Sequence, residues 1–258
     1  MPTENTLVTI AFSHYCEKAR WALDLAGIPY REDKHLPLMH LAFTRPRGGR
    51  STPLLALTDG TVLTDSTDIL DWVDAASTAN GASPIWPTDR ETAATARTVE
   101  TQLDERFGPH ARRLGYWHLL GAPPQLLLDF ARVAPRAEQM VLRVFRPLVV
   151  AFIRRSLKID EAGARRSESI VRETFAAMSD RLARGAGYLV GTHFSAADLT
   201  FASLAAPLIF PDHHPISWPS LDRIPPAMRT LVEELRATPA GRHVQRMYAE
   251  HRPPHPLS

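Results

Sequence analysis

The hydrophobic pattern of this chain changes near residue 80, and the change limits the folds that are open to it. Before that point, segments with the alternation of strands are interleaved with segments of helical periodicity. After it, helical periodicity dominates, over 88–114, 124–157, 163–184, 195–208 and 225–250. We therefore predict a small α/β domain at 1–78, a turn-rich linker at 79–89 and an all-helical domain at 90–258.

The first part of the small domain has the pattern of a strand, a helix and a second strand. Leu7–Phe12 is rich in β-forming residues, and the apolar residues at 19, 22, 23 and 26 have the spacing of one helix face. Gly27 followed by Pro29 predicts the end of that helix. We expect an extended segment at 28–31, and a βαβ unit of this length predicts that its two strands are parallel.

The second part of the small domain has the pattern of a hairpin and a helix. Strand-like segments at 54–57 and 62–63 flank Asp59-Gly60, a strong signal for a two-residue turn. Asp65-Ser66 then opens a segment with apolar residues at 69, 70 and 73. The order βαβ followed by ββα predicts a thioredoxin-like fold.

Charge and cysteine content exclude several classes of protein. The formal net charge is only +2, which is too small to indicate a nucleic-acid-binding surface. A single cysteine cannot form an internal disulfide. The apolar segment at 141–157 contains Arg143, Arg146 and Pro147 and is too charged to span a bilayer. The first residues lack the basic and apolar regions of a signal peptide. We expect a soluble cytoplasmic protein with no nucleic-acid and no membrane partner.

The stretch Ser13-His14-Tyr15-Cys16 lies between the first strand and the first helix and holds the only cysteine. Ser13 suits the N-cap of that helix, where its oxygen would accept a backbone N–H. A helix N-terminus also carries partial positive charge, which lowers a thiol's pKa from about 8.5 toward neutrality. A serine hydroxyl can donate a hydrogen bond to such a thiolate. The thiol can belong to Cys16 or to a bound molecule.

Four motifs give the chain a family resemblance. "SHYCEKARWALDLAGIPY" resembles the first motif of the cytosolic glutathione transferases, in particular their serine and cysteine classes of bacterial type. "STPLL" resembles the family's cis-proline motif, "TDSTDIL" its γ-glutamyl-binding motif and "YLVGTHFSAADLTF" its motif in the helical domain. The resemblance covers residues 7–75 and 185–206, whereas 110–165 matches only as generic helix.

The resemblance implies a thioredoxin-like domain, a helical domain and a transferase that joins glutathione to a small hydrophobic electrophile in detoxification. It implies glutathione as co-substrate, no metal and a homodimer. Ser13 and Cys16 would be the catalytic candidates. The residues that would bind glutathione are Tyr15, Arg50, Thr52, Pro53, Asp65 and Ser66, with Thr52–Pro53 in the cis form.

Simpler interpretations of these residues remain open. Ser13 and the pair Asp65-Ser66 could serve only as helix caps, and Pro53 could be an ordinary trans proline. Cys16 could be a small buried side chain or the working thiol of a thiol transferase or peroxidase. A third possibility is a glutathione-transferase-like binding or scaffold protein without turnover.

Other features have mainly structural interpretations. Ser195 and Asp198 have the spacing of a helix-capping pair, so we expect a role in folding. Residues 212–214, Asp-His-His, lack a second ligand pair at zinc spacing, so we expect no metal. The residues at 116–118 could line a pocket for the electrophile or belong to the core. The segment 251–258 is expected to be irregular.

Overall fold

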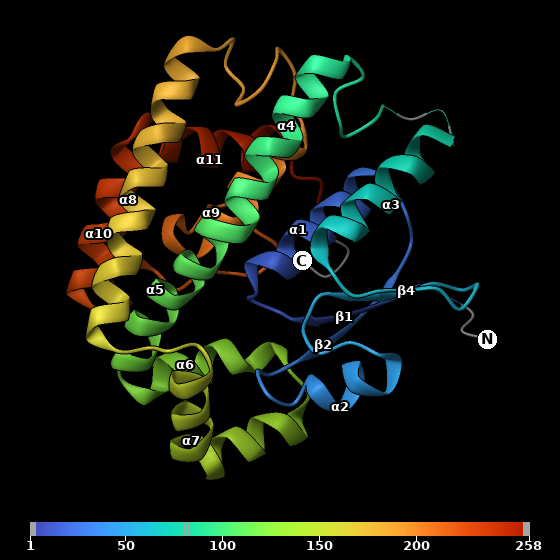
Figure 1. Ribbon diagram of the computed structural model, residues 1–258. Helices are drawn as coiled ribbons and strands as arrows, with labels where there is room; N and C mark the ends of the chain where they lie inside the picture. Colours follow the sequence, from blue (N-terminus) through green and yellow to red (C-terminus); the bar gives the residue numbers. More distant parts are fainter. Residues whose placement is uncertain (1–3, 80, 82, 255–258) are drawn as a thin grey trace.

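The computed structural model describes residues 4–79, 81 and 83–254, and it has a small sheet with its helices beside an all-helical part (Figure 1). The elements of the first part are β1 (Thr6–Ile10), α1 (His14–Leu25), β2 (Arg31–His35), α2 (Leu41–Thr44), β3 (Leu54–Ala56), β4 (Val62–Leu63) and α3 (Ser66–Ala79). The predicted order βαβ followed by ββα is confirmed.

The sheet has the strand order β2-β1-β3-β4. β1 pairs with β2 in parallel and with β3 in antiparallel, so Val8 lies between Asp33 and Leu54. Helices α1 and α3 cover one face of the sheet, and α2 lies on the other side (Figure 1). This arrangement places the turn between β1 and α1 at one end of the sheet, close to the helical part.

The second strand lies further along the chain than we predicted. The sequence pattern placed it at 28–31, but the pairing with β1 begins at Arg31, which lies opposite Thr6. Gly27 ends α1 as predicted, because it adopts φ +62°, a conformation that favours glycine. Pro29 has no N–H to donate to a strand, and this explains why pairing starts only after it.

The second part contains α4 (Arg90–Gln102), η2 (Leu103–Phe107), α5 (Gly108–Gly121), α6 (Pro124–Phe130), α7 (Arg136–Ser156), α8 (Glu161–Arg184), α9 (Ala196–Ile209), α10 (Pro226–Ala237) and α11 (Pro239–His251). The segment η2 is a π-helical turn that joins α4 to α5. Short 3₁₀ turns lie at 45–47, 131–133 and 221–223. Within the described part of the chain, no helix has the length and apolar composition needed to cross a membrane.

Three helical segments are interrupted where the pattern predicted continuous helices. The segment 124–157 breaks at Ala134 and the segment 225–250 at Thr238, each of which is extended before a proline. Proline disfavours helical geometry in the residue that precedes it, which accounts for both breaks. The segment 88–114 passes through the π-helical turn and continues to Gly121.

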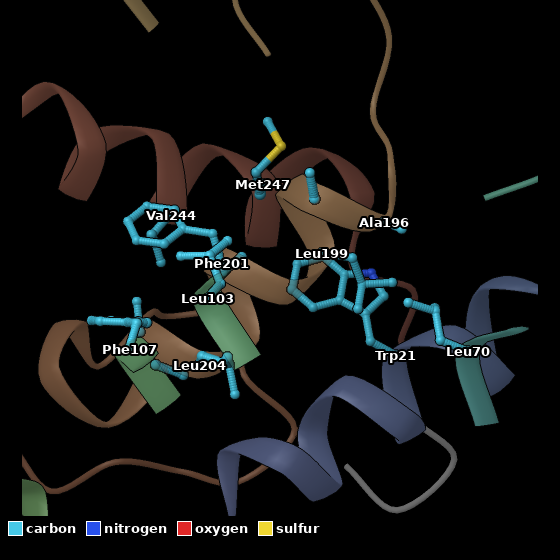
Figure 2. Packing of buried hydrophobic residues seen from close by; sticks show 14 of the residues in the cluster. Trp21, Leu70, Leu103, Phe107, Ala196, Leu199, Phe201, Leu204, Val244 and Met247 are labelled. Carbon is cyan, nitrogen blue, oxygen red and sulfur yellow. The ribbon is translucent and has the colours of Figure 1, made fainter. Parts of the chain in front are cut away.

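One hydrophobic core joins the two parts of the molecule. Trp21 of α1 is fully buried in the same cluster as Leu199 of α9 and Met247 of α11 (Figure 2). The indole N–H of Trp21 donates to the backbone carbonyl of His251, at 3.0 Å. The position of α1, and of the turn that precedes it, therefore depends on the helical part.

A buried ionic network also ties the end of the described chain to α1. Arg252 lies 2.7 Å from Glu17 and 2.8 Å from Asp24, and Arg20 contacts both Glu17 and Glu32. Burial alone would raise the pKa of Glu17, but Arg252 and the other cations outweigh it and lower this pKa to about 2. Of the segment 251–258, which we expected to be irregular, His251 still belongs to α11, 252–254 have no regular secondary structure and 255–258 lie outside the described residues. Arg252 is nevertheless buried and paired.

Candidate active site

Ser13 occupies the N-cap position of α1, but its side chain does not cap the helix. Its backbone is extended, and its carbonyl accepts the first helical hydrogen bond, from the N–H of Glu17 at 2.9 Å. Among the described residues, no N–H of the first turn donates to the Ser13 hydroxyl. The interpretation of this side chain as a cap is therefore wrong; its hydroxyl lies close enough to the Cys16 sulfur to influence the pKa of that thiol.

Ser13 lines a cavity of about 350 Å³ between the sheet domain and the helical part. From the sheet domain, the turn before α1 and the segment before β3 form one wall. From the helical part, α5 presents Arg112, Gly115, Tyr116 and Leu119, which follow one helix face. Aromatic side chains complete a mostly apolar wall, namely Phe12, Phe130, Phe152, Phe210 and Trp218.

Cys16 lies one turn after Ser13 and is completely buried. Burial raises the pKa of the Cys16 thiol, against the opposing influence of Arg20 and of the nearby Ser13 and Thr52 hydroxyls. Cys16 is not among the residues that line the cavity. A protonated, inaccessible thiol fits the interpretation of a small buried side chain.

The Thr52–Pro53 peptide bond is cis, as predicted. Thr52 lines the cavity, whereas Pro53 is buried beneath it. Arg50 is exposed and lines both the cavity and a neighbouring hollow formed by Leu41, Arg45, Gly48 and Gly49. The segment before β3 therefore brings Arg50 and Thr52 to the wall that also holds Ser13.

Asp65 and Ser66 lie at the start of α3 and are not among the residues that line the cavity. The carboxylate of Asp65 accepts the backbone N–H of Thr67 at 2.8 Å and caps the helix. Asp65 is exposed and Ser66 is buried. Burial raises the pKa of Tyr15, and the carboxylates of Asp104 and Asp65 add to this effect.

Tyr15 does not line the cavity but holds the π-helical turn. Its hydroxyl donates to the carbonyl of Asp104 at 2.8 Å, and its neighbour His14 donates from Nε2 to the carbonyl of Gly108 at 3.0 Å. Burial lowers the pKa of His14 to about 3, so this side chain is neutral near pH 7. The geometry gives Tyr15 a role in joining α1 to the helical part.

Lys18 is a buried cation that sequence reasoning did not single out. Its ammonium group contacts Glu100 and Asp104 of the helical part and donates to the hydroxyl of Thr67 at 2.9 Å. The network thus connects α1, the first turn of α3 and the junction between α4 and α5. No local signal reveals it, because its three partners lie at least 49 residues away in the chain.

Ser195 and Asp198 have the structural role expected of them. Ser195 donates its N–H and its hydroxyl to the carboxylate of Asp198, which His243 also contacts at 2.9 Å. Of the residues at 116–118, only Tyr116 lines the cavity. The side chain of His214 is buried, and burial lowers its pKa to about 4. Nowhere in the described ranges do three or more His, Cys, Asp or Glu side chains form a group that could hold a metal.

Two family profiles match the chain over more than half of its length. Residues 12–76 match "Glutathione S-transferase, N-terminal domain" and residues 161–237 match "Glutathione S-transferase, C-terminal domain". No curated protein sequence matches the chain.

Several solved structures share the fold at low sequence identity. FzlA from C. crescentus is 21% identical, with a TM-score of 0.55 over 94% of this chain and 92% of that one. The β-etherase LigF from Sphingobium sp. strain SYK-6 is 18% identical, with a TM-score of 0.59 over 94% and 98%. A glutathione transferase homologue from Sulfitobacter, solved with bound glutathione, is 19% identical, with a TM-score of 0.52 over 95% and 98%.

Proposed function

Because this chain belongs to the glutathione S-transferase superfamily, we propose that it binds glutathione at the sheet domain and joins the glutathione sulfur to a small apolar electrophile, so that the whole glutathionyl group is transferred. The observation that carries this proposal is the position of the Ser13 hydroxyl. It lies at the positive end of α1, belongs to a residue that lines the cavity and, among the described residues, caps no backbone N–H. A hydroxyl in this position can donate to a thiolate held at the helix end.

The proposed chemistry needs a thiolate and a positioned acceptor. Glutathione loses its thiol proton to solvent, and the hydroxyl of Ser13 and the N-terminus of α1 stabilise the resulting charge. The sulfur then attacks an electrophilic carbon of the acceptor in the apolar part of the cavity. With an aryl chloride, a C–S bond forms, the C–Cl bond breaks and chloride leaves. Holding the two reactants together supplies a large part of the rate.

The anchors for glutathione follow from the chemistry of the residues near Ser13. We propose that the backbone of Thr52, beside Pro53, pairs with the cysteinyl part and that Arg50 binds the glycine carboxylate. Ser66 and Asp65, at the start of α3, would bind the γ-glutamyl end, the serine its carboxylate and the aspartate its ammonium group. The bound glutathione in the Sulfitobacter homologue supports glutathione as the ligand of this fold.

The placement of Ser66 can be tested directly. Ser66→Ala should weaken glutathione binding by about 1–3 kcal/mol, because a charged carboxylate loses a hydrogen bond. Thr67→Val is the matched control: Thr67 is the next residue of the same turn, and its hydroxyl is already engaged with Lys18 and Glu100. Calorimetry should show the loss in the first variant; unchanged affinity in a folded Ser66→Ala protein would refute this anchor.

A simple experiment separates the proposed activity from the alternatives. Retention on a glutathione-affinity column together with conjugation of chlorodinitrobenzene would support the transferase. Retention without conjugation would leave thiol transfer through Cys16 or simple binding. Absence of both would favour a scaffold protein. Because Cys16 is buried and its thiol has a raised pKa, we favour the thiol of bound glutathione over that of Cys16 as the reactive group.

We also propose that the protein is a cytoplasmic homodimer that removes toxic electrophiles. Family members usually form two-fold dimers in which the first domain of one subunit contacts the second domain of the other. Sedimentation at micromolar concentration should therefore give twice the 28.7 kDa of one chain. A species at the mass of one chain would overturn the proposed dimer without affecting the proposed chemistry.

A further inference from the structure

The cavity has an unbalanced charge. Two arginines line it, Arg50 from the sheet domain and Arg112 from α5, and no aspartate or glutamate is among the described residues that line it. His14, which also lines the cavity, is neutral near pH 7 because burial lowers its pKa to about 3. The cavity is therefore apolar and electropositive, and its ligands should bring negative charge.

Arg112 is the less exposed of these two cations, and among the described residues it takes part in no ion pair and no hydrogen bond. Its guanidinium lies 5.8 Å from the ring of Tyr15, and its positive charge adds to burial in lowering the pKa of His14. The other buried cations beside α1 are all paired: Lys18 contacts Glu100, and Arg20 contacts Glu17. Partial burial of an unpaired guanidinium has a desolvation cost that a bound anion would offset.

The position of Arg112 assigns its partner to the acceptor rather than to glutathione. Arg112 lies one turn before Tyr116 on α5, so it lines the cavity from the helical part, whereas Thr52 and Arg50 line it from the sheet domain. Tyr116, Phe130 and Trp218 also line the cavity from the helical part. This part of the cavity thus offers aromatic rings to an apolar body and the guanidinium of Arg112 to an anionic group.

We propose that Arg112 binds a carboxylate of the acceptor, so that the preferred acceptor is an aromatic electrophile that carries a carboxylate. This inference rests on the proposed glutathione transfer and names the substrate class of the same site. The guanidinium is planar and can pair with a carboxylate through two parallel hydrogen bonds. Pairing would fix the orientation of the ring and hence the position of the electrophilic carbon relative to the sulfur.

A pair of electrophiles with the same reacting centre tests the proposal. 4-Chloro-3,5-dinitrobenzoate and its methyl ester both lose chloride from C4 when a thiolate attacks, but only the first carries a charge. Wild-type protein should have the higher kcat/KM for the acid. Arg112→Met should lower kcat/KM for the acid by at least about tenfold, since a charged hydrogen bond is lost, and leave that for the ester nearly unchanged. Arg112→Lys should keep part of the preference.

A second measurement does not depend on turnover. 3,5-Dinitrobenzoate lacks the chlorine and cannot react, so calorimetry reports its binding alone. It should bind wild-type protein at least about tenfold more tightly than Arg112→Met. Arg143→Met is the matched control, because it removes the same group from an exposed position on α7, outside the cavity. This control should bind 3,5-dinitrobenzoate as wild type does.

The outcomes separate the two proposals. Equal losses for the acid and the ester, or equal binding of 3,5-dinitrobenzoate to wild type and Arg112→Met, would overturn the assigned partner of Arg112. Absence of 3,5-dinitrobenzoate binding to wild type would do the same. If neither electrophile is conjugated but 3,5-dinitrobenzoate binding still requires Arg112, the transferase proposal fails and the anion site stands.

Discussion

Replacement of Ser13 by alanine tests the proposed mechanism most directly. The change removes one hydroxyl from the cavity wall and leaves the N-terminus of α1 in place. Because this hydroxyl caps no N–H of the helix among the described residues, its loss should have little effect on the free energy of unfolding. A change in activity would therefore report on the chemistry.

The size of the effect follows from the loss of one hydrogen bond to a charge. Such a bond contributes about 1.5–3 kcal/mol, and one pKa unit corresponds to about 1.4 kcal/mol. We therefore expect the pKa of the bound glutathione thiol to rise by about one to two units. The N-terminus of α1 would still stabilise the thiolate by about 0.3–1 kcal/mol. Turnover near pH 7 should then fall at least about tenfold in Ser13→Ala.

The pH dependence of kcat at saturating glutathione measures this shift. Activity of Ser13→Ala should recover as the pH rises toward the new pKa, while calorimetry shows nearly unchanged affinity for glutathione. Ser156→Ala is a matched control, because Ser156 also lines the cavity but belongs to α7. Its pH profile should coincide with that of wild type.

Superposable pH profiles for wild type and a folded Ser13→Ala protein would refute the reasoning. If Cys16 is the working thiol, Cys16→Ala should abolish activity instead. Its thiolate would attack glutathione disulfide, form a mixed disulfide and release one glutathione. Mass spectrometry of the wild-type protein after such treatment would then show the added mass of one glutathionyl group. If Ser13 is the working residue, no such mass should appear.

Two further predictions concern stability. Gly108→Ala should lower the free energy of unfolding by about 1–3 kcal/mol, because the new methyl group would collide with the phenol of Tyr15. Gly115→Ala is the control, because its methyl group would meet only Pro207, at 3.7 Å, and it should leave the free energy of unfolding unchanged. Thermal denaturation of the two variants measures the difference. Arg252→Met should lower the free energy of unfolding by about 3–5 kcal/mol, because it leaves the carboxylate of Glu17 buried beside fewer cations. The pKa of Glu17 is about 2 in the folded protein against a usual value of 4.5, so its contribution is complete above pH 4.5 and is lost as the pH falls toward 2. Denaturation across this range should show a shallower pH dependence in Arg252→Met, and parallel curves for the two proteins would contradict the pairing.

Local patterns predicted the elements that depend on local physics. The end of α1 at Gly27 and the pairing of Ser195 with Asp198 both involve neighbouring residues. Asp59-Gly60 also lies in the turn of a hairpin, although residues 57–61 connect its strands and not the predicted two residues. The first strand and the first helix follow periodicities of two and 3.6 residues, so their positions were also predictable. The family motifs placed Ser13 and Thr52 on one wall, and the structure brings both to the cavity.

The features that sequence reasoning missed depend on contacts between distant residues. Lys18 meets Glu100 across 82 positions, and Arg252 meets Glu17 across 235. No periodicity within a helix marks such partners. Arg112 lies in the segment where the family resemblance is weakest. That it lines a cavity becomes visible only when α5 is placed against the sheet domain in the structure. The two helix breaks before prolines have a local cause and could have been predicted. Our prediction missed them because it followed the helical spacing of the apolar residues on either side.

The buried pairing of Arg252 with α1 has a consequence for the order in which the protein can form during synthesis. A ribosome releases Glu17 and Asp24 long before it adds Arg252, so in the nascent first domain Glu17 has, among the described residues, only Arg20 as a cationic partner and Asp24 lacks its contact with Arg252. Trp21 likewise stays exposed until α9 and α11 are made, because residues of these helices form the cluster that buries it (Figure 2). The sheet domain should therefore stay loosely folded until the helical part emerges, and a fragment limited to residues 1–78 should be a poor substitute for the full chain. Glutathione binding would then be a property acquired only late in translation.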